Sequence, residues 1–169
     1  KWVGNYLSPE LAIMDSHREM LYRVGEYARH HGYVSERGVN CGIDYFISGD
    51  DIMITEINAR WTGGLFPAQY LQRLGVDQPA VAFFDMVDCQ DREALEAFQS
   101  QHLYVHGAAD FSYIPMGFTP FEMEIEGSAR YFVWQIVVGD FASFVEAKAR
   151  SLGKSAFPTA DLILKEALK

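Results

Sequence analysis

Four polar residues that lie close together in the sequence have the types and spacing of a site for a metal ion and a phosphate group. Asp44 stands in an apolar run. Glu56, Asn58 and Arg60 follow at alternate positions of a second apolar run. Carboxylate and amide oxygens are ligands that Mg²⁺ accepts, and a guanidinium group holds phosphate oxygens with its planar set of donors. These residues could therefore support metal-assisted chemistry on a phosphate group.

Two strand-like segments must position these residues. Residues 39–48 and 52–58 are rich in isoleucine, tyrosine and phenylalanine, and Gly49-Asp50-Asp51 separates them, which predicts a hairpin. Glycine accommodates the unusual backbone angles of such a turn. We expect a three-residue loop over 49–51, which makes Ser48 the partner of Ile52.

This pairing brings the two acidic residues together. Counting back from the loop places Asp44 directly opposite Glu56, and it places Gly42 opposite Asn58 with open space above the glycine. The two-residue period of a strand keeps Glu56, Asn58 and Arg60 on one face. Two facing carboxylates repel, and a divalent cation is the simplest compensation. The alternative is a solvated surface hairpin that binds nothing.

Composition bounds the class of protein. The chain has 169 residues, which fits one domain, or one domain with an appendage. A net charge of −9 argues against a nucleic-acid partner, and no apolar run is long enough to predict a membrane span. Two cysteines are too few for a disulfide framework, and no secretory signal is visible. We expect a cytoplasmic protein.

The remaining elements alternate in type along the chain. Apolar periodicity, caps and breakers predict helices over 14–31, 66–74, 78–87, 91–100, 141–152 and 158–168. Aromatic and β-branched residues predict strands within 102–115 and 119–138. This order favours an α+β fold. The expected buried face of the first helix carries Ile13, Met20, Val24 and Tyr27, with Leu21 and Ala28 beside them.

Two further groups of residues are weaker candidates. Thr62, Gly63 and Gly64 form a candidate substrate loop, because the helix that opens beyond them would direct free N–H groups at an anionic group. An ordinary strand-to-helix turn is an equally good interpretation of that loop. His102 and His106 would share a face of a strand, but no third metal ligand lies near them in the sequence.

The hairpin resembles the C-terminal part of the ATP-grasp superfamily of carboxylate–amine ligases, whose nucleotide site ends in an acid on one strand and Glu-x-Asn-x-Arg on the next. Here these are Asp44 and Glu56-Ile57-Asn58-Ala59-Arg60. The resemblance covers residues 14–66, and the loop after the motif is similar to that of amino-acid or peptide ligases. It implies an antiparallel sheet with packed helices over 1–75, and a small α/β extension over 76–169.

The resemblance also implies roles for individual residues. Asp44, Glu56 and Asn58 would bind one or two Mg²⁺ ions that bridge ATP phosphates, and Mn²⁺ could replace Mg²⁺. Arg60 would contact the nucleotide phosphates and act as the catalytic residue on the transferred phosphoryl group. Ile52 and Ile54 would form one wall for the adenine.

The resemblance implies small-molecule substrates as well. A carboxylate would be phosphorylated to an acyl-phosphate, and an amine would displace the phosphate. Thr62, Gly63 and Gly64 would contact these substrates.

Lysine usage limits this interpretation. No lysine lies between Lys1 and Lys148, whereas the family holds the triphosphate with lysines from a second subdomain. We therefore expect a C-terminal fragment of a longer ligase that lacks its N-terminal part, is inactive alone and could form a homodimer. The alternative is a non-catalytic domain of ATP-grasp type that binds a nucleotide, a metal or a protein partner.

Overall fold

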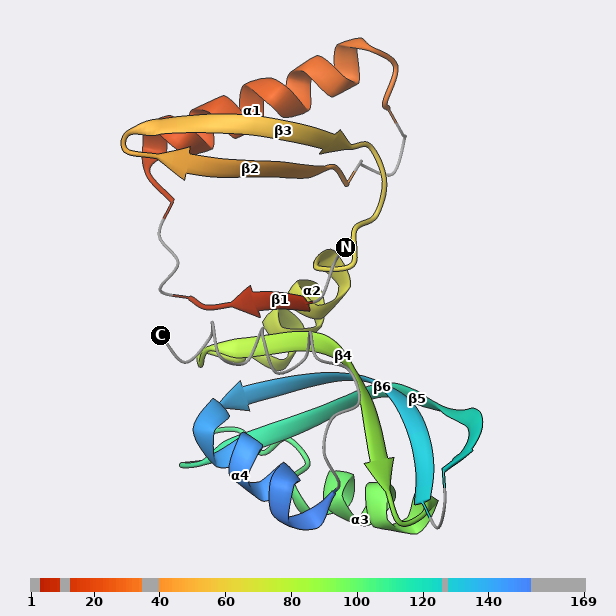
Figure 1. Cartoon of the computed structure of the whole chain (residues 1–169). Coiled ribbons are helices and arrows are strands. Elements are labelled where there is room, and N and C mark those ends of the chain that lie inside the picture. The colour runs from red at the N-terminus through yellow and green to blue at the C-terminus, as the bar shows by residue number, and fades with distance from the viewer. Residues whose placement is uncertain (1–3, 10–12, 35–39, 126–127, 153–169) are drawn as a thin grey trace. The chain divides into compact units, whose positions relative to one another are not determined.

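The chain is α+β and forms two compact units, each described here by itself. A computed structural model describes residues 4–9, 13–34, 40–125 and 128–152 (Figure 1). Leu11–Phe66 makes the first unit, which we call the hairpin unit. Lys1–Glu10 and Pro67–Lys169 make the second, which we call the sheet unit. The division expected after residue 75 differs from this one, because the start of the chain pairs with the sheet that follows.

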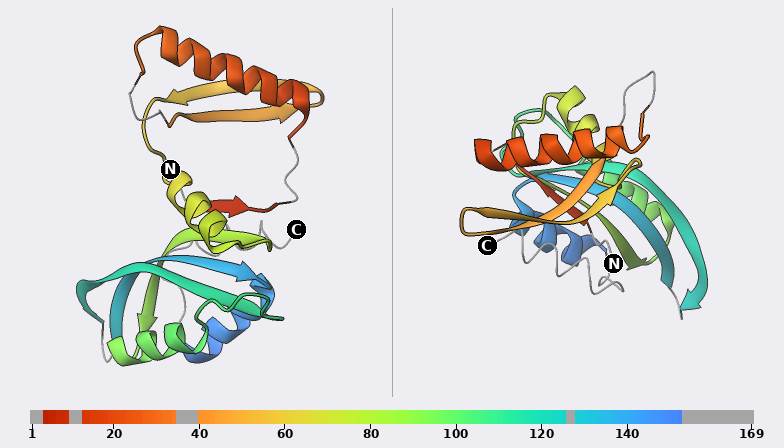
Figure 2. Two further views of the ribbon diagram at one scale, coloured as in Figure 1. Left: turned by 180° about the vertical axis from the view of Figure 1, so that it is seen from behind. Right: turned by 90° about the horizontal axis from the view of Figure 1, so that it is seen from above.

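The hairpin unit consists of one helix on a two-stranded antiparallel ribbon. Helix α1 (Asp15–His30) precedes strands β2 (Gly42–Ser48) and β3 (Asp51–Asn58). The helix lies over one face of the ribbon and contacts β3 (Figure 2). The helix ends where Gly32 adopts a φ of +92°, a left-handed conformation that glycine allows at low cost.

The buried face of α1 agrees with the expected one at Ala28 but not at Met20 and Tyr27. His17 and Ala28 are buried, whereas Met20 and Tyr27 are exposed. The imidazole Nε2 of His17 lies 2.8 Å from the backbone oxygen of Asp50, in the turn between the strands. A long-range polar contact thus shifts the buried stripe, and local apolar periodicity does not reveal such a contact.

The hairpin turn has two residues, not three. Ser48 pairs with Asp51, and Gly49 has a φ of +62°, which fits the glycine-first turn that joins antiparallel strands. The expected pairing of Ser48 with Ile52 is therefore wrong. A β-bulge restores the expected register further along: Ile54 pairs with Tyr45, Thr55 is the extra residue, and the next pair is Asp44 with Glu56.

The sheet unit is built on a four-stranded antiparallel sheet in the order β1-β4-β6-β5. Its strands are β1 (Gly4–Leu7), β4 (Ala80–Cys89), β6 (Ser128–Gly139) and β5 (Phe111–Ile125). Helices α3 (Arg92–Gln101) and α4 (Phe141–Ser151) cover one face (Figure 1). From Pro67 onward, α2 (Leu65–Leu74) belongs to this unit, and its Leu71 packs against the other face.

Residues 78–87 were expected to be helical, and this expectation is wrong. Most of this segment lies in strand β4, where Ala80, Val81, Ala82 and Phe83 have no exposed surface. A strand buried on both faces has a continuous apolar run, which periodicity does not distinguish from a buried helix.

Some other elements also differ from the expected ones. The expected strand over 102–115 begins only at Phe111, and β1 at the start of the chain was not expected. The expected helix over 158–168 lies outside the described residues. Among the described residues, no helix has the length and apolar character needed to cross a membrane.

One buried ion pair crosses the core of the sheet unit. Lys148 of α4 donates a hydrogen bond to the carboxylate of Asp85 in β4, and both residues are buried. They lie among apolar residues such as Val87, Val133 and Phe144. Desolvated charges of opposite sign compensate one another only in contact, so this pair fixes α4 on β4.

Candidate functional site

The register of the hairpin gathers the expected metal ligands on one face. Asp44 lies directly opposite Glu56, as the sequence predicts, and Asn58 lies two residues beyond Glu56 on the same strand. The amide Nδ2 of Asn58 donates a hydrogen bond to Oδ2 of Asp44 at 3.2 Å. Asn58 is only 8% exposed, so this hydrogen bond holds a largely desolvated amide beside the carboxylate.

The bulge determines which side chains share this face. The hydroxyl of Thr55, the extra residue, donates to the backbone oxygen of Asp44 at 3.0 Å and so closes the bulge against β2. Because Ile54 pairs with Tyr45 and Glu56 pairs with Asp44, the side chains of Ile54 and Glu56 point to opposite faces. Without the bulge, the two would share a face.

The expected adenine wall therefore lies on the other side of the ribbon from the acids. Ile52 and Ile54 pair with Ile47 and Tyr45, on the face that carries Ile43. Phe46 and Met53 pair with one another on the acidic face instead, and they are 49% and 45% exposed. Sequence reasoning missed these two residues, because only the position of the bulge reveals their side.

The segment after β3 folds back onto the site. A Cβ atom at Gly42 would lie 2.2 Å from Cγ2 of Thr62 and 3.5 Å from the Cβ of Asn58. The space expected above Gly42 is therefore not open, because the side chain of Thr62 fills it. The structure thus brings Thr62, a candidate substrate residue, to the candidate metal ligand Asn58.

The neighbours of Thr62 are arranged around the start of α2. Gly63 and Gly64 form the turn before the helix, and the backbone N–H of Leu65 donates to the carbonyl of Thr62 at 3.1 Å. Arg60 lies beyond the end of β3 and is exposed, with Nη1 3.4 Å from the backbone oxygen of Trp61. Its guanidinium is thus accessible to an anion, and no strand fixes its direction.

This face carries two acidic residues that oppose one another directly. Neither Asp44 nor Glu56 takes part in any of the ion pairs between described residues. Two facing carboxylates with no basic partner raise the free energy of a hairpin. Two carboxylates and one amide oxygen are a donor set that fits Mg²⁺, which completes its shell with water and phosphate oxygens.

Two carboxylates of the sheet unit, those of Asp85 and Asp88, have basic partners. Arg130 donates from Nε and Nη2 to the two oxygens of Asp88, at 2.5 and 2.7 Å. These hydrogen bonds from Arg130 hold the pKa of the Asp88 carboxyl below its ordinary value. Such a pair stabilises the sheet and leaves no site for a cation.

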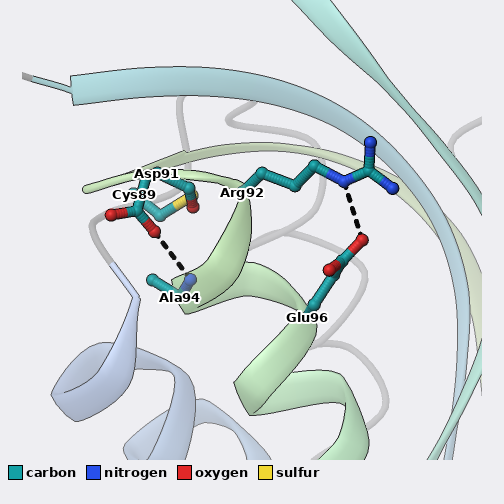
Figure 3. A network of polar contacts seen from close by, with 5 residues as sticks. All are labelled: Cys89, Asp91, Arg92, Ala94 and Glu96. Atoms are coloured by element: carbon teal, nitrogen blue, oxygen red, sulfur yellow. Dashed lines mark hydrogen bonds and ion pairs between the residues drawn. The ribbon is translucent and has the colours of Figure 1, made fainter.

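The thiol near the start of α3 is structural (Figure 3). The carboxylate of Asp91 accepts a hydrogen bond from the backbone N–H of Ala94 at 2.8 Å and so caps the helix. Cys89 donates from Sγ to the backbone oxygen of Asp91 at 3.2 Å. Burial raises the pKa of this thiol, and the charges of Asp91 and Asp88 raise it further. Its thiolate is therefore disfavoured, which argues against a role as a nucleophile.

The histidine pair of the second half does not form a metal site with described acids or cysteines. His102 and His106 lie in a loop rather than on a strand, and no group of three or more histidine, cysteine or acidic residues is close enough to bind a metal among the described residues. The ring of His102 packs 4.5 Å from that of Phe111, and burial lowers its pKa.

Comparisons of the chain with protein-family models, with curated proteins and with solved structures found no match. The functional inference consequently rests on the residues and contacts of this chain.

Proposed function

We propose that this chain carries the metal-binding part of the nucleotide site of an ATP-dependent carboxylate–amine ligase of the ATP-grasp type. One observation carries the proposal: Asp44 and Glu56 face one another across a hairpin, no described basic residue pairs with either, and Asn58 is hydrogen-bonded beside them. The strain of two facing acids is relieved when a cation binds between them.

Each polar residue then has a role in phosphoryl transfer to a carboxylate. Asp44, Glu56 and Asn58 would hold one or two Mg²⁺ ions, which neutralise charge on the ATP phosphates. Arg60, exposed just beyond β3, would bind the transferred phosphoryl group with its planar donors. The product of the first step would be an acyl-phosphate, whose phosphate an amine displaces in the second step.

The base and the substrates would contact neighbouring parts of the same unit. Phe46 and Met53 offer an exposed apolar surface on the acidic face, which suits the flat face of an adenine better than Ile52 and Ile54 on the opposite face. Thr62 touches the end of the site, so the loop from Thr62 to Gly64 is placed to contact the carboxylate or the amine.

Lysine usage favours a second candidate function, metal or nucleotide binding without catalysis. No lysine occurs between Lys1 and Lys148, so any lysine that binds the triphosphate must come from outside this stretch. A longer cytoplasmic ligase would supply those lysines from an N-terminal part. The 169 residues alone would bind metal but would not turn over ATP.

Binding of Mn²⁺, followed by electron paramagnetic resonance and competed by Mg²⁺, tests the proposal on the 169-residue chain. We expect Glu56→Gln and Asp44→Asn each to weaken binding at least tenfold. Glu19→Gln, which removes an exposed acid from α1, serves as the matched control and should leave binding unchanged. Equal binding by wild type and Glu56→Gln would contradict the proposed metal site.

A second assay separates the two candidate functions. ADP formation from ATP, with mixtures of amino acids as carboxylate and amine donors, should be undetectable for the isolated chain. ATP turnover that Glu56→Gln abolishes would show that the chain is a complete enzyme and that the proposed lysine part is not needed.

A further inference from the structure

The hairpin unit contains a groove on the face of the ribbon that lies away from Asp44 and Glu56. It encloses about 540 Å³ between α1 and the start of β2, a volume within the range of small-molecule sites. Leu21, Val34 and Ile43 contribute apolar surface to it. Ile43 precedes Asp44 on β2, so their side chains point to opposite faces, and the groove is separate from the proposed metal site.

A glycine in the middle of α1 keeps this groove open. Gly25 lines the groove, and no atom lies within 4 Å of the position that a Cβ atom would take there. Glycine in a helix interior lowers helix stability relative to alanine, because the unfolded chain loses more conformational freedom. A side chain longer than a methyl group at this position would project into the groove.

The charged lining of the groove is positive, in a chain of net charge −9. Among the residues that the structure describes, it comprises Arg18 and Arg29 against the single acid Glu26. The two arginines are eleven positions apart on α1, which places them about 16 Å apart along the helix axis. Arg29 lies 3.3 Å from Glu26, whereas the partner of Arg18 is Asp15, 3.6 Å away and outside the groove.

Arg18 is therefore the cation most available to a ligand. Its side chain and that of Asp15 are 55% and 98% exposed, and ion pairs of such exposure are weak and readily exchanged. An anion at Arg18 would gain a desolvated apolar neighbour in Leu21, which the solvated Asp15 does not have.

We propose that this groove binds an elongated apolar anion, such as a fatty or aryl carboxylate, with its anionic group at Arg18 and its apolar body over Gly25 towards Ile43. The groove follows α1 from Arg18 to Arg29, has apolar side chains in its lining and carries a cation at its Arg18 end, and these three properties match that class of molecule. This proposal goes beyond the ligase function and does not depend on it.

Binding of 8-anilinonaphthalene-1-sulfonate, an aromatic anion whose fluorescence rises in apolar surroundings, tests the proposal, with decanoate as the competitor. We expect wild type to bind the probe saturably and decanoate to displace it. Gly25→Leu, which fills the floor of the groove, should weaken decanoate competition at least tenfold. Circular dichroism would verify that this variant retains its helices.

Arginine variants supply the matched pair. Arg18→Met should weaken decanoate binding about tenfold, whereas Arg23→Met, on the same helix but outside the groove, should leave it unchanged. Equal loss in both variants would indicate a general charge effect and would overturn the proposal. Displacement of the probe by decanoate that is as strong in Gly25→Leu as in wild type would also overturn it.

Alkylation of Cys41 gives a readout that needs no variant to fold. Cys41 lines the groove and is partly exposed, whereas Cys89 is buried and serves as an internal control. Decanoate should slow the reaction of iodoacetamide with Cys41 saturably. An unchanged rate would overturn the proposal. A concentration-dependent dimer that Gly25→Leu abolishes would assign the groove to a second copy of the chain and would also contradict it.

Discussion

Two pairs of acidic residues, one pair in each unit, are placed in opposite electrostatic settings. In the sheet unit, Asp85 contacts Lys148 in the core, and Asp88 receives two hydrogen bonds from Arg130. In the hairpin unit, Asp44 faces Glu56, and neither is in an ion pair with a described residue. Paired acids stabilise a fold, whereas facing acids without a cation weaken it. A bound cation would therefore stabilise Asp44 and Glu56, whereas Asp85 and Asp88 already have basic partners.

Breaking the buried pair should have the largest effect. Lys148→Met leaves Asp85 charged and without this partner in an apolar core, so we expect a loss of about 3–5 kcal/mol in the free energy of unfolding. Urea denaturation would measure it. The double variant Asp85→Leu with Lys148→Met removes both charges and should lose less. If the double variant loses as much stability as Lys148→Met and Asp85→Leu lose together, the two residues do not act as a pair.

The contact between Gly42 and Thr62 should have the next largest effect, because it packs the loop after β3 against the start of β2. A methyl group at position 42 would overlap Cγ2 of Thr62, so Gly42→Ala should cost about 1–3 kcal/mol. Thr62→Ser keeps the hydroxyl and removes the overlapping carbon. Gly42→Ala should therefore lower the free energy of unfolding much less in the Thr62→Ser protein than in wild type, as urea denaturation would measure. Equal losses in the two proteins would argue against the contact.

The ion pair between Asp88 and Arg130 should have a smaller effect on stability, and this effect depends on pH. Hydrogen bonds from Arg130 lower the pKa of Asp88 in the folded state, so the stabilisation is present above the ordinary pKa of aspartate and is lost as the pH falls through the lowered value. Asp88→Asn should cost about 1 kcal/mol at pH 7 and less at lower pH. Denaturation at pH 7 and at pH 3 would measure this, and a cost independent of pH would contradict the ion pair.

The same substitution in the hairpin should have the opposite sign. Without divalent metal, Asp44→Asn removes the repulsion with Glu56 and should raise stability by about 0.2–1 kcal/mol. Chelator-treated samples at low salt would measure the change most sensitively. A loss of stability on Asp44→Asn would indicate that an unrecognised positive group already compensates the two acids.

The sequence predicted that Asp44 faces Glu56, but it did so partly because two deviations from the expected hairpin cancel. The turn is one residue shorter than expected, and the bulge at Thr55 adds one residue back, so Asp44 still meets Glu56. Nothing in the residue types around Thr55 signals a bulge. The face of Ile54 consequently could not be predicted, whereas the facing pair could.

Tertiary contacts explain the other differences. Strand β4 is buried on both faces, and its unbroken apolar run gives no period from which to distinguish it from a helix. His17 is buried because it contacts the backbone of Asp50, 33 residues away. The Gly42–Thr62 contact joins residues that are adjacent only after the chain turns beyond β3.

The response of the hairpin acids to Mg²⁺ tests the central claim most directly. Thermal unfolding of wild type and Glu56→Gln would be followed with and without Mg²⁺. Without metal, the variant should be the more stable protein, because the repulsion is gone. At ten times the dissociation constant of wild type, Mg²⁺ should stabilise wild type by about 1.4 kcal/mol and the variant by at most about 0.4 kcal/mol, and so bring wild type level with the variant or above it. An equal Mg²⁺ response in both proteins, or none in wild type, would contradict the account.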